Sequence, residues 1–250
     1  MIDTHAHLDM CDDAPAEVLE RATSAGVTRV VTVGTGIESG QRVLEIAEST
    51  QGVACALGVH PHDAGSVTAA DLDELRRLLQ HPAAVAVGET GLDYYRDYAP
   101  RESQSEVFAA HIALAVEIDK PLVIHSRAAD DDTLDALATV PASTPVVLHC
   151  LSSLVLAEAA VERGYYVSFA GNVTYPNARE LRAAARVIPS NRLLAETDAP
   201  YLAPQPVRGQ RSEPAHVMHT LSALADTRRE NLRALERTID DNASTFFGIE

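Results

Sequence analysis

The chain has 250 residues with a formal net charge of −16, and hydrophobic residues make up 46% of it. This length is typical of one (β/α)8 barrel and allows a large core. The negative charge argues against a protein that reads DNA through a basic face, although divalent metals and a few arginines could still neutralise phosphate locally.

The sequence also limits where the protein resides. No apolar stretch reaches the roughly 18 residues that a membrane-spanning helix needs. The first residues have neither the basic nor the apolar segment of a signal peptide. Cys11, Cys55 and Cys150 are few, odd in number and without pattern, which is typical of a reducing compartment. We therefore expect a cytoplasmic protein with no membrane partner and no obligate protein partner.

Apolar runs alternate with helical patterns along the whole chain. We expect strands at 2–5, 29–33, 53–59, 84–87, 122–125, 146–149, 165–169 and 193–195, and helices that include 16–25, 41–50, 72–79, 102–117, 133–139 and 154–163. Eight strands that alternate with helices predict a (β/α)8 TIM barrel. A doubly wound sheet is the main alternative, but it would need fewer strands. No linker interrupts the pattern, so we expect one domain over residues 1–250.

Several apolar strands end in a side chain that can bind a metal. Runs of four or five apolar residues predict parallel strands buried on both faces. The carboxyl ends of such strands form one rim, where these proteins place their chemistry. Strand-end ligands therefore predict a binuclear metal site at the C-terminal rim. The candidate ligands are His5, His7, Glu89, His125, His149 and Asp198.

Local spacing supports this ligand set. His5 and His7 are two apart on a strand, so both imidazoles should face the same ion. Glu89 follows Gly88, whose missing side chain we interpret as room for a ligand, and Glu89 is expected to bridge two ions. If the last strand continues, Glu196 and Asp198 point to the same side. Nitrogen and oxygen ligands suit Mg²⁺, Mn²⁺ or Zn²⁺, so we expect two divalent ions, with Mg²⁺ or Mn²⁺ the working metals.

Further residues are candidates for the chemistry and for substrate contact. Two metals lower the pKa of a shared water, and we expect Asp198 to take its proton, with Glu89 also in the catalytic set. His62 could orient a phosphate or protonate a leaving group, whereas we interpret His60 as structural. Arg208 and Arg211 lie in the loop after Asp198 and could bind phosphate oxygens.

The candidate residues lie in longer motifs that are spread over the chain. The motifs are DTHAHLD at 3–9, GVHPH at 58–62, GETGLDYY at 88–95, PLVIHSR at 121–127 and ETDAPYL at 196–202, with a tail at 242–249. Together they resemble the TatD family of metal-dependent deoxyribonucleases, within the amidohydrolase-type barrel hydrolases. The resemblance implies metal ligation by the same six residues and nuclease activity. It also implies that Glu89 replaces the carboxylated lysine of other branches.

Three positions depart from the pattern of the family that the chain resembles. Leu151 and Ser153 stand where family members commonly have Phe and Gly, and Gln210 stands where they have Lys. We expect Leu151 to remove a surface on which a base could stack, Ser153 to stiffen its loop, and Gln210 to remove a positive charge. These changes leave the ligand set intact and leave the substrate open.

We therefore expect a metal-dependent phosphodiesterase that hydrolyses DNA by attack of a metal-activated water. Its expected partner is single-stranded DNA or DNA with free 3′ ends, which it would degrade in the 3′–5′ direction. The alternative is a hydrolase of an ester, amide, lactone or aminoacyl-tRNA bond that uses the same barrel. A non-catalytic binding protein that keeps the barrel is the third reading, and the complete ligand set argues against it.

Overall fold

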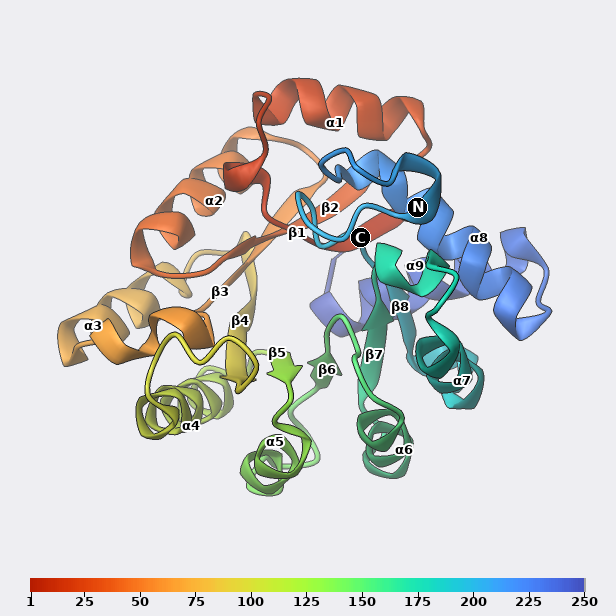
Figure 1. The fold of residues 1–250 in the computed structure, drawn as a ribbon. Coiled ribbons are helices and arrows are strands. Elements are labelled where there is room, and N and C mark those ends of the chain that lie inside the picture. The colour runs from red at the N-terminus through yellow and green to blue at the C-terminus, as the bar shows by residue number, and fades with distance from the viewer. Residues whose placement is uncertain (250) are drawn as a thin grey trace. The chain divides into compact units, whose positions relative to one another are not determined.

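The computed structural model describes residues 1–249, in which strands and helices alternate (Figure 1). The eight strands of this described part form one sheet in the order β1 to β8, and all the pairs with a resolved register are parallel. The predicted (β/α)8 fold is confirmed. The strands are β1 (Ile2–Ala6), β2 (Arg29–Gly34), β3 (Val53–Leu57), β4 (Ala84–Asp93), β5 (Leu122–Arg127), β6 (Val146–Leu148), β7 (Tyr166–Phe169) and β8 (Leu193–Ala195).

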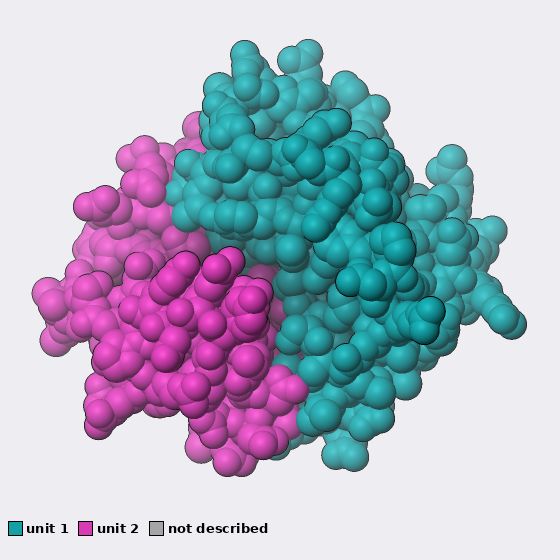
Figure 2. Space-filling view, in the orientation of Figure 1, with its two compact units in different colours: residues 1–32, 150–250 teal, residues 33–149 magenta. Residues whose placement is uncertain are grey.

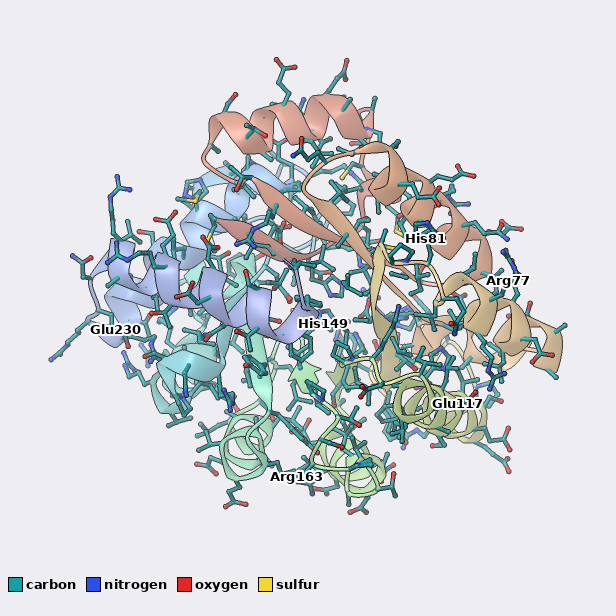
Figure 3. The ribbon with its side chains drawn as sticks, turned by 180° about the vertical axis from the view of Figure 1, so that it is seen from behind. Arg77, His81, Glu117, His149, Arg163 and Glu230 are labelled. Atoms are coloured by element: carbon teal, nitrogen blue, oxygen red, sulfur yellow. The ribbon has the colours of Figure 1, made fainter. Side chains whose placement is uncertain are left out.

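Helices follow the strands, and charged residues mark their outer faces. Arg77 and Glu117, labelled in Figure 3, are exposed on α3 and α4. No helix within residues 1–249 is long and apolar enough to cross a membrane. The helices are α1 (Pro15–Ser24), α2 (Ile37–Ser49), α3 (Ala69–Leu78), α4 (Arg101–Glu117), α5 (Asp130–Leu137), α6 (Leu154–Arg163), α7 (Arg179–Val187), α8 (Val217–Arg228) and α9 (Leu232–Phe247).

The chain divides into two compact units, which are coloured separately in Figure 2. The first unit comprises residues 1–32 and 150–250, and the second comprises residues 33–149. In the first unit, α9 packs beside β8, and the Asn242 side chain donates hydrogen bonds to the carbonyls of Ser190 and Leu193. In the second unit, α4 packs against β4.

Strand β4 (Ala84–Asp93) is longer than the strand predicted at 84–87 from the apolar run. Its pairing with β5 continues to Asp93 and Arg127, so Glu89 lies inside the strand and not at its end. Gly88 and Gly91 have φ angles of 139° and 138°, and a Cβ at either position would collide with a carbonyl of β5. The interpretation of Gly88 as room for a ligand is therefore wrong, because the neighbouring strand makes the close approach.

Strand β8 ends before Glu196 and Asp198, so these residues do not share one side of a continuing strand. It ends at Ala195, and Asp198 has a left-handed φ of 56°. The alternation of side chains along a strand therefore does not extend to these two residues. Glu196 instead accepts a hydrogen bond from the Ser168 hydroxyl at 2.6 Å.

Candidate metal centre

In the second unit, one buried carboxylate faces several imidazoles. The Glu89 Oε1 atom lies 2.8 Å from His125 Nδ1 and 2.7 Å from His149 Nε2. His60 Nε2 is 3.5 Å from the same oxygen. Glu89 is only 3% exposed, and His149, labelled in Figure 3, follows directly after β6. We call Glu89, His60, His125 and His149 the Glu89 cluster.

The protonation of this cluster fits a cation site. Burial raises the pKa of Glu89, but the charges of His149 and His60 and hydrogen bonds from His125 and His149 outweigh it, so the pKa lies well below its usual range. Burial lowers the pKa of His125, and hydrogen bonds to Asp93 and Glu89 overcome this effect and raise it. The carboxylate is thus held ionised by positive charge around it. A divalent cation supplies such charge and binds neutral imidazoles, so the donors of His60, Glu89 and His125 fit one.

Asp93, which lies outside the predicted ligand set, belongs to the same region. Its Oδ2 atom lies 2.9 Å from His62 Nε2 and 3.3 Å from His125 Nε2. Burial raises the pKa of Asp93, but the hydrogen bonds, led by that from His125, lower it overall. Carboxylates commonly orient metal-binding histidines in this way. The signal was available in the sequence, because Asp93 is four residues after Glu89 and shares its strand face.

In the first unit, three donors converge on a second point. His5 and His7 are buried, and their Nε2 atoms lie 3.4 Å apart. Asp198 Oδ1 is 3.5 Å from His7 Nε2 and 3.9 Å from His5 Nε2. Two imidazoles and one carboxylate in this arrangement are a donor set for a divalent ion. The proximity that the spacing of His5 and His7 predicts is therefore present, with Asp198 beside it.

Asp3 holds this group of donors in place. It is fully buried, and its carboxylate accepts hydrogen bonds from the Thr197 N–H at 2.9 Å and the His5 N–H at 3.3 Å. The Thr197 hydroxyl donates to its other oxygen at 2.5 Å. Asp198 N–H in turn donates to the His5 carbonyl at 2.9 Å. Burial raises the pKa of Asp3 to about 8, against the lowering effect of these hydrogen bonds.

The predicted substrate-binding residues lie in different surroundings. His62 is 28% exposed at its side chain and is bonded to Asp93. Arg208 is exposed and stacks over the Tyr175 ring at 4.1 Å. Arg211 is also exposed, with its Nε atom 3.0 Å from an Asp12 carboxylate oxygen. Both guanidinium groups are therefore open to solvent in the first unit, and their contact with substrate stays a prediction.

Two of the departures from the family pattern have structural explanations. Leu151 is 2% exposed, so its side chain presents no surface on which a base could stack, as expected for that position. Ser153 is the N-cap of α6, and its hydroxyl accepts the Leu156 N–H at 3.1 Å. Capping satisfies one of the four N–H groups that a helix leaves unbonded at its start. Ser153 therefore stabilises a helix end.

Imidazoles and carboxylates gathered in and just after the strands of a (β/α)8 fold are typical of metal-dependent barrel hydrolases. Residues 2–248 match the family model described as TatD related DNase. The chain belongs to this family and is a metal-dependent hydrolase acting on ester bonds.

Relatives of known sequence or structure agree with this assignment. The chain is 42% identical to the Mycobacterium tuberculosis protein named "Uncharacterized metal-dependent hydrolase TatD", covering 100% of this chain and 98% of that protein. It is 36% identical to the Klebsiella pneumoniae "3'-5' ssDNA/RNA exonuclease TatD", covering 94% of this chain and 92% of that protein. The crystal structure of YjjV, a TatD homologue from Escherichia coli, matches with a TM-score of 0.94 and 33% identity, covering 100% of this chain and 98% of that chain.

Proposed function

We propose that this protein is a phosphodiesterase that removes nucleotides from the 3′ ends of single-stranded DNA. The observation that carries the proposal is the presence of two donor groups built from buried and partly buried histidines and carboxylates. The names of relatives such as the Klebsiella exonuclease support a nucleic acid as the substrate.

The proposed metal ligands are the six residues that the sequence predicts. We assign two divalent ions, Mg²⁺ or Mn²⁺ with Zn²⁺ as the alternative, to a set that provides four imidazoles and two carboxylates. When bound, such ions lower the pKa of water and stabilise charge on phosphate oxygens. His60 is an additional donor, because it lies beside Glu89 and His125. The six ligands are His5, His7, Glu89, His125, His149 and Asp198.

Different side chains then accept and donate the protons of the reaction. The Asp198 carboxylate accepts a proton from the attacking water, whose oxygen forms a bond to phosphorus. The bond from phosphorus to the 3′ oxygen breaks, and His62 donates a proton to that oxygen. Asp93, 2.9 Å from His62 Nε2, orients the imidazole. Glu89 keeps the imidazoles around it in place, and Arg208 and Arg211 bind phosphate oxygens. The products are a nucleoside 5′-monophosphate and a shortened strand with a 3′ hydroxyl.

The test is hydrolysis of a 5′-labelled single-stranded oligonucleotide by chelator-treated protein, with Mg²⁺ or Mn²⁺ added back. We expect a ladder that shortens from the 3′ end, no cleavage without metal and none by Glu89→Ala. Glu158→Ala, on the exposed face of α6, is the matched control and should cleave normally. If folded, metal-loaded protein leaves every strand intact, the proposal fails, and carbonyl substrates such as esters, amides, lactones and aminoacyl-tRNA are to be assayed instead.

We also propose that residues 1–250 form one domain and that the protein works in the cytoplasm. The family model spans residues 2–248 without interruption. Within the described residues the three cysteines are thiols, as a reducing compartment would keep them. Fractionation of cells that express the tagged protein would test the location.

A further inference from the structure

Two tyrosines stand out on the surface of the second unit. The chain has seven tyrosines and no tryptophan. Tyr95 and Tyr98 are 64% and 66% exposed, more than the other exposed large hydrophobic side chains of the described chain. Both lie in the short segment between β4 and α4. Two highly exposed aromatic rings in one short segment mark a candidate contact surface.

This segment is anchored beside the Glu89 cluster. Asp93 accepts hydrogen bonds from the N–H groups of Tyr95 at 3.0 Å and Arg96 at 2.9 Å. The Tyr98 ring meets the His62 ring edge to face, with centroids 4.8 Å apart. Ala99, which follows, is buried in an apolar cluster with Val59, Ala64 and Val107. The tyrosines are thus held in place next to the residue that bonds both His62 and His125.

Arginines accompany the exposed rings. The Arg127 guanidinium lies 4.1 Å from the centroid of Tyr95, and that of Arg96 lies 5.8 Å from it. Arg127 is two residues after His125 on β5, so both side chains leave the strand on the same side. The rings and the positive charges therefore lie together in a chain whose net charge is −16.

Acidic side chains near Tyr95 and Tyr98 form contacts with groups other than Arg96 and Arg127. Asp97 faces Arg101 at 3.8 Å, and Asp132 accepts the Tyr94 hydroxyl at 2.6 Å. Asp130 and Asp131 begin α5 beside them. Arg96 and Arg127 have no carboxylate within salt-bridge distance among the ion pairs of the described residues, so their charge is available to an anion.

We propose that Tyr95, Tyr98, Arg96 and Arg127 form a binding platform for the nucleotides next to the cleaved bond of a single strand. The exposed part of each ring can stack on an unpaired base, alongside the guanidinium groups over Tyr95, which can bind the phosphates. Bases in a duplex already stack on one another, so the platform selects single strands with little preference for sequence. The inference rests on the proposed nuclease function and identifies a substrate subsite for it.

The test compares an intact single strand with a matched strand of abasic sites, which keeps the phosphates and lacks the bases. Binding is measured by fluorescence anisotropy with Mg²⁺ present, in full-length Glu89→Gln protein so that the strands remain whole. We expect Tyr95→Ala and Tyr98→Ala each to raise the Kd of the intact strand about tenfold and to leave the abasic Kd unchanged. Tyr95→Phe and Tyr98→Phe keep the ring and should bind normally.

Control variants separate stacking from other roles. Tyr165→Ala changes a half-buried tyrosine before β7 and should bind both strands normally. Arg127→Gln should weaken binding of both strands and reduce the salt dependence, because it acts on phosphate. Equal effects of Tyr98→Ala on both strands, or an unchanged Kd together with a lower kcat of Tyr98→Ala in protein that keeps Glu89, would overturn the platform in favour of a contact that only positions His62.

Failure of the platform and failure of the nuclease are distinguishable. If wild-type protein cleaves the strand but the tyrosine variants bind and cleave it normally, the platform is wrong and the nuclease stands. If wild-type protein cleaves nothing, the proposed nuclease activity is wrong. The Kd values of the intact and abasic strands, compared between wild-type protein and the tyrosine variants, still test the platform. Binding of duplex as tight as that of single strands would also overturn it.

Discussion

At the scale of single residues, Asp93 connects the proposed proton donor His62 to the proposed metal ligand His125. One carboxylate oxygen lies near both His62 and His125, and the other accepts two N–H groups of the following segment. The Asp93 N–H itself donates to Gln104 at 2.8 Å. The position of His125 therefore depends on a residue that need not touch the metal.

The substitution Asp93→Asn tests this dependence. It keeps the size of the side chain but removes the negative charge that orients His62 and His125. We expect metal affinity and kcat each to fall about 10- to 100-fold, the usual effect of losing such a partner. Metal binding is measured by calorimetry and kcat on the labelled oligonucleotide. Asp97→Asn, at an exposed acid of the same segment, is the control, and equal metal affinity in all three proteins would contradict the role.

The two ring nitrogens of His111 both contact backbone groups. It is fully buried on α4, its Nε2 accepts the Val59 N–H at 3.0 Å, and its Nδ1 lies 2.7 Å from the Val107 carbonyl. This pairing needs the neutral ring, with the proton on Nδ1. Burial lowers the pKa of His111 from 6.5 to about 4, despite the hydrogen bond to Val107.

This shift predicts a pH dependence of stability. The unfolded chain binds a proton at His111 below pH 6.5, whereas the folded chain binds it only near pH 4. Unfolding therefore takes up a proton in this window, and the free energy of unfolding falls as the pH falls, by about 3 kcal/mol in total. Urea denaturation from pH 7 to pH 4 should show a smaller loss for His111→Gln, which does not titrate. Parallel curves for the two proteins would refute the assignment.

At the scale of elements, α4 acts on the ends of two strands. Gln104 and His111 are two turns apart on this helix and share a face. Gln104 holds the backbone of Asp93 at the end of β4, and His111 holds the backbone of Val59 just after β3. The helix thus fixes both segments from which His62 and Asp93 extend, while its outer face carries exposed charges.

Helix α6 allows a cap to be tested apart from the chemistry. Because the Ser153 hydroxyl accepts the Leu156 N–H, Ser153→Ala should lower the free energy of unfolding by about 1 kcal/mol. Ser153→Gly introduces the residue that family members commonly have. It should lower the free energy of unfolding by only a few tenths of a kcal/mol, since glycine is tolerated at N-caps. Urea denaturation of the three proteins measures the difference. A loss for glycine as large as that for alanine would show that the hydroxyl bond is not the cause.

At the scale of the whole molecule, the boundary between the two compact units falls inside β2, between Thr32 and Val33. The first unit is also made of two separate segments of the chain. Neither feature is typical of domains that fold alone, whose boundaries lie in exposed linkers. This is the physical basis for proposing one domain.

One domain predicts one cooperative unfolding transition. Far-ultraviolet circular dichroism and tyrosine absorbance should report the same Tm. Metal that binds only the folded state should stabilise it, by about 2.7 kcal/mol when free metal is about 100 times its Kd, and chelation should remove this gain. Two separated transitions in chelator-treated protein would contradict a single domain. A Tm that does not change when Mg²⁺, Mn²⁺ or Zn²⁺ is added would contradict the proposed metal ligands.

The sequence by itself determined the (β/α)8 fold and the candidate ligands, because buried parallel strands are apolar runs and the polar residues that interrupt or follow them are easily recognised. The grouping of His5 with His7 followed from their spacing alone. The tertiary structure decided what depends on hydrogen bonds between distant segments. Register between β4 and β5 extends β4 past Glu89 to Asp93, and His60 joins the Glu89 cluster only when its own loop is placed. Spacing along a chain predicts which side a residue faces, but its partners come from neighbouring elements.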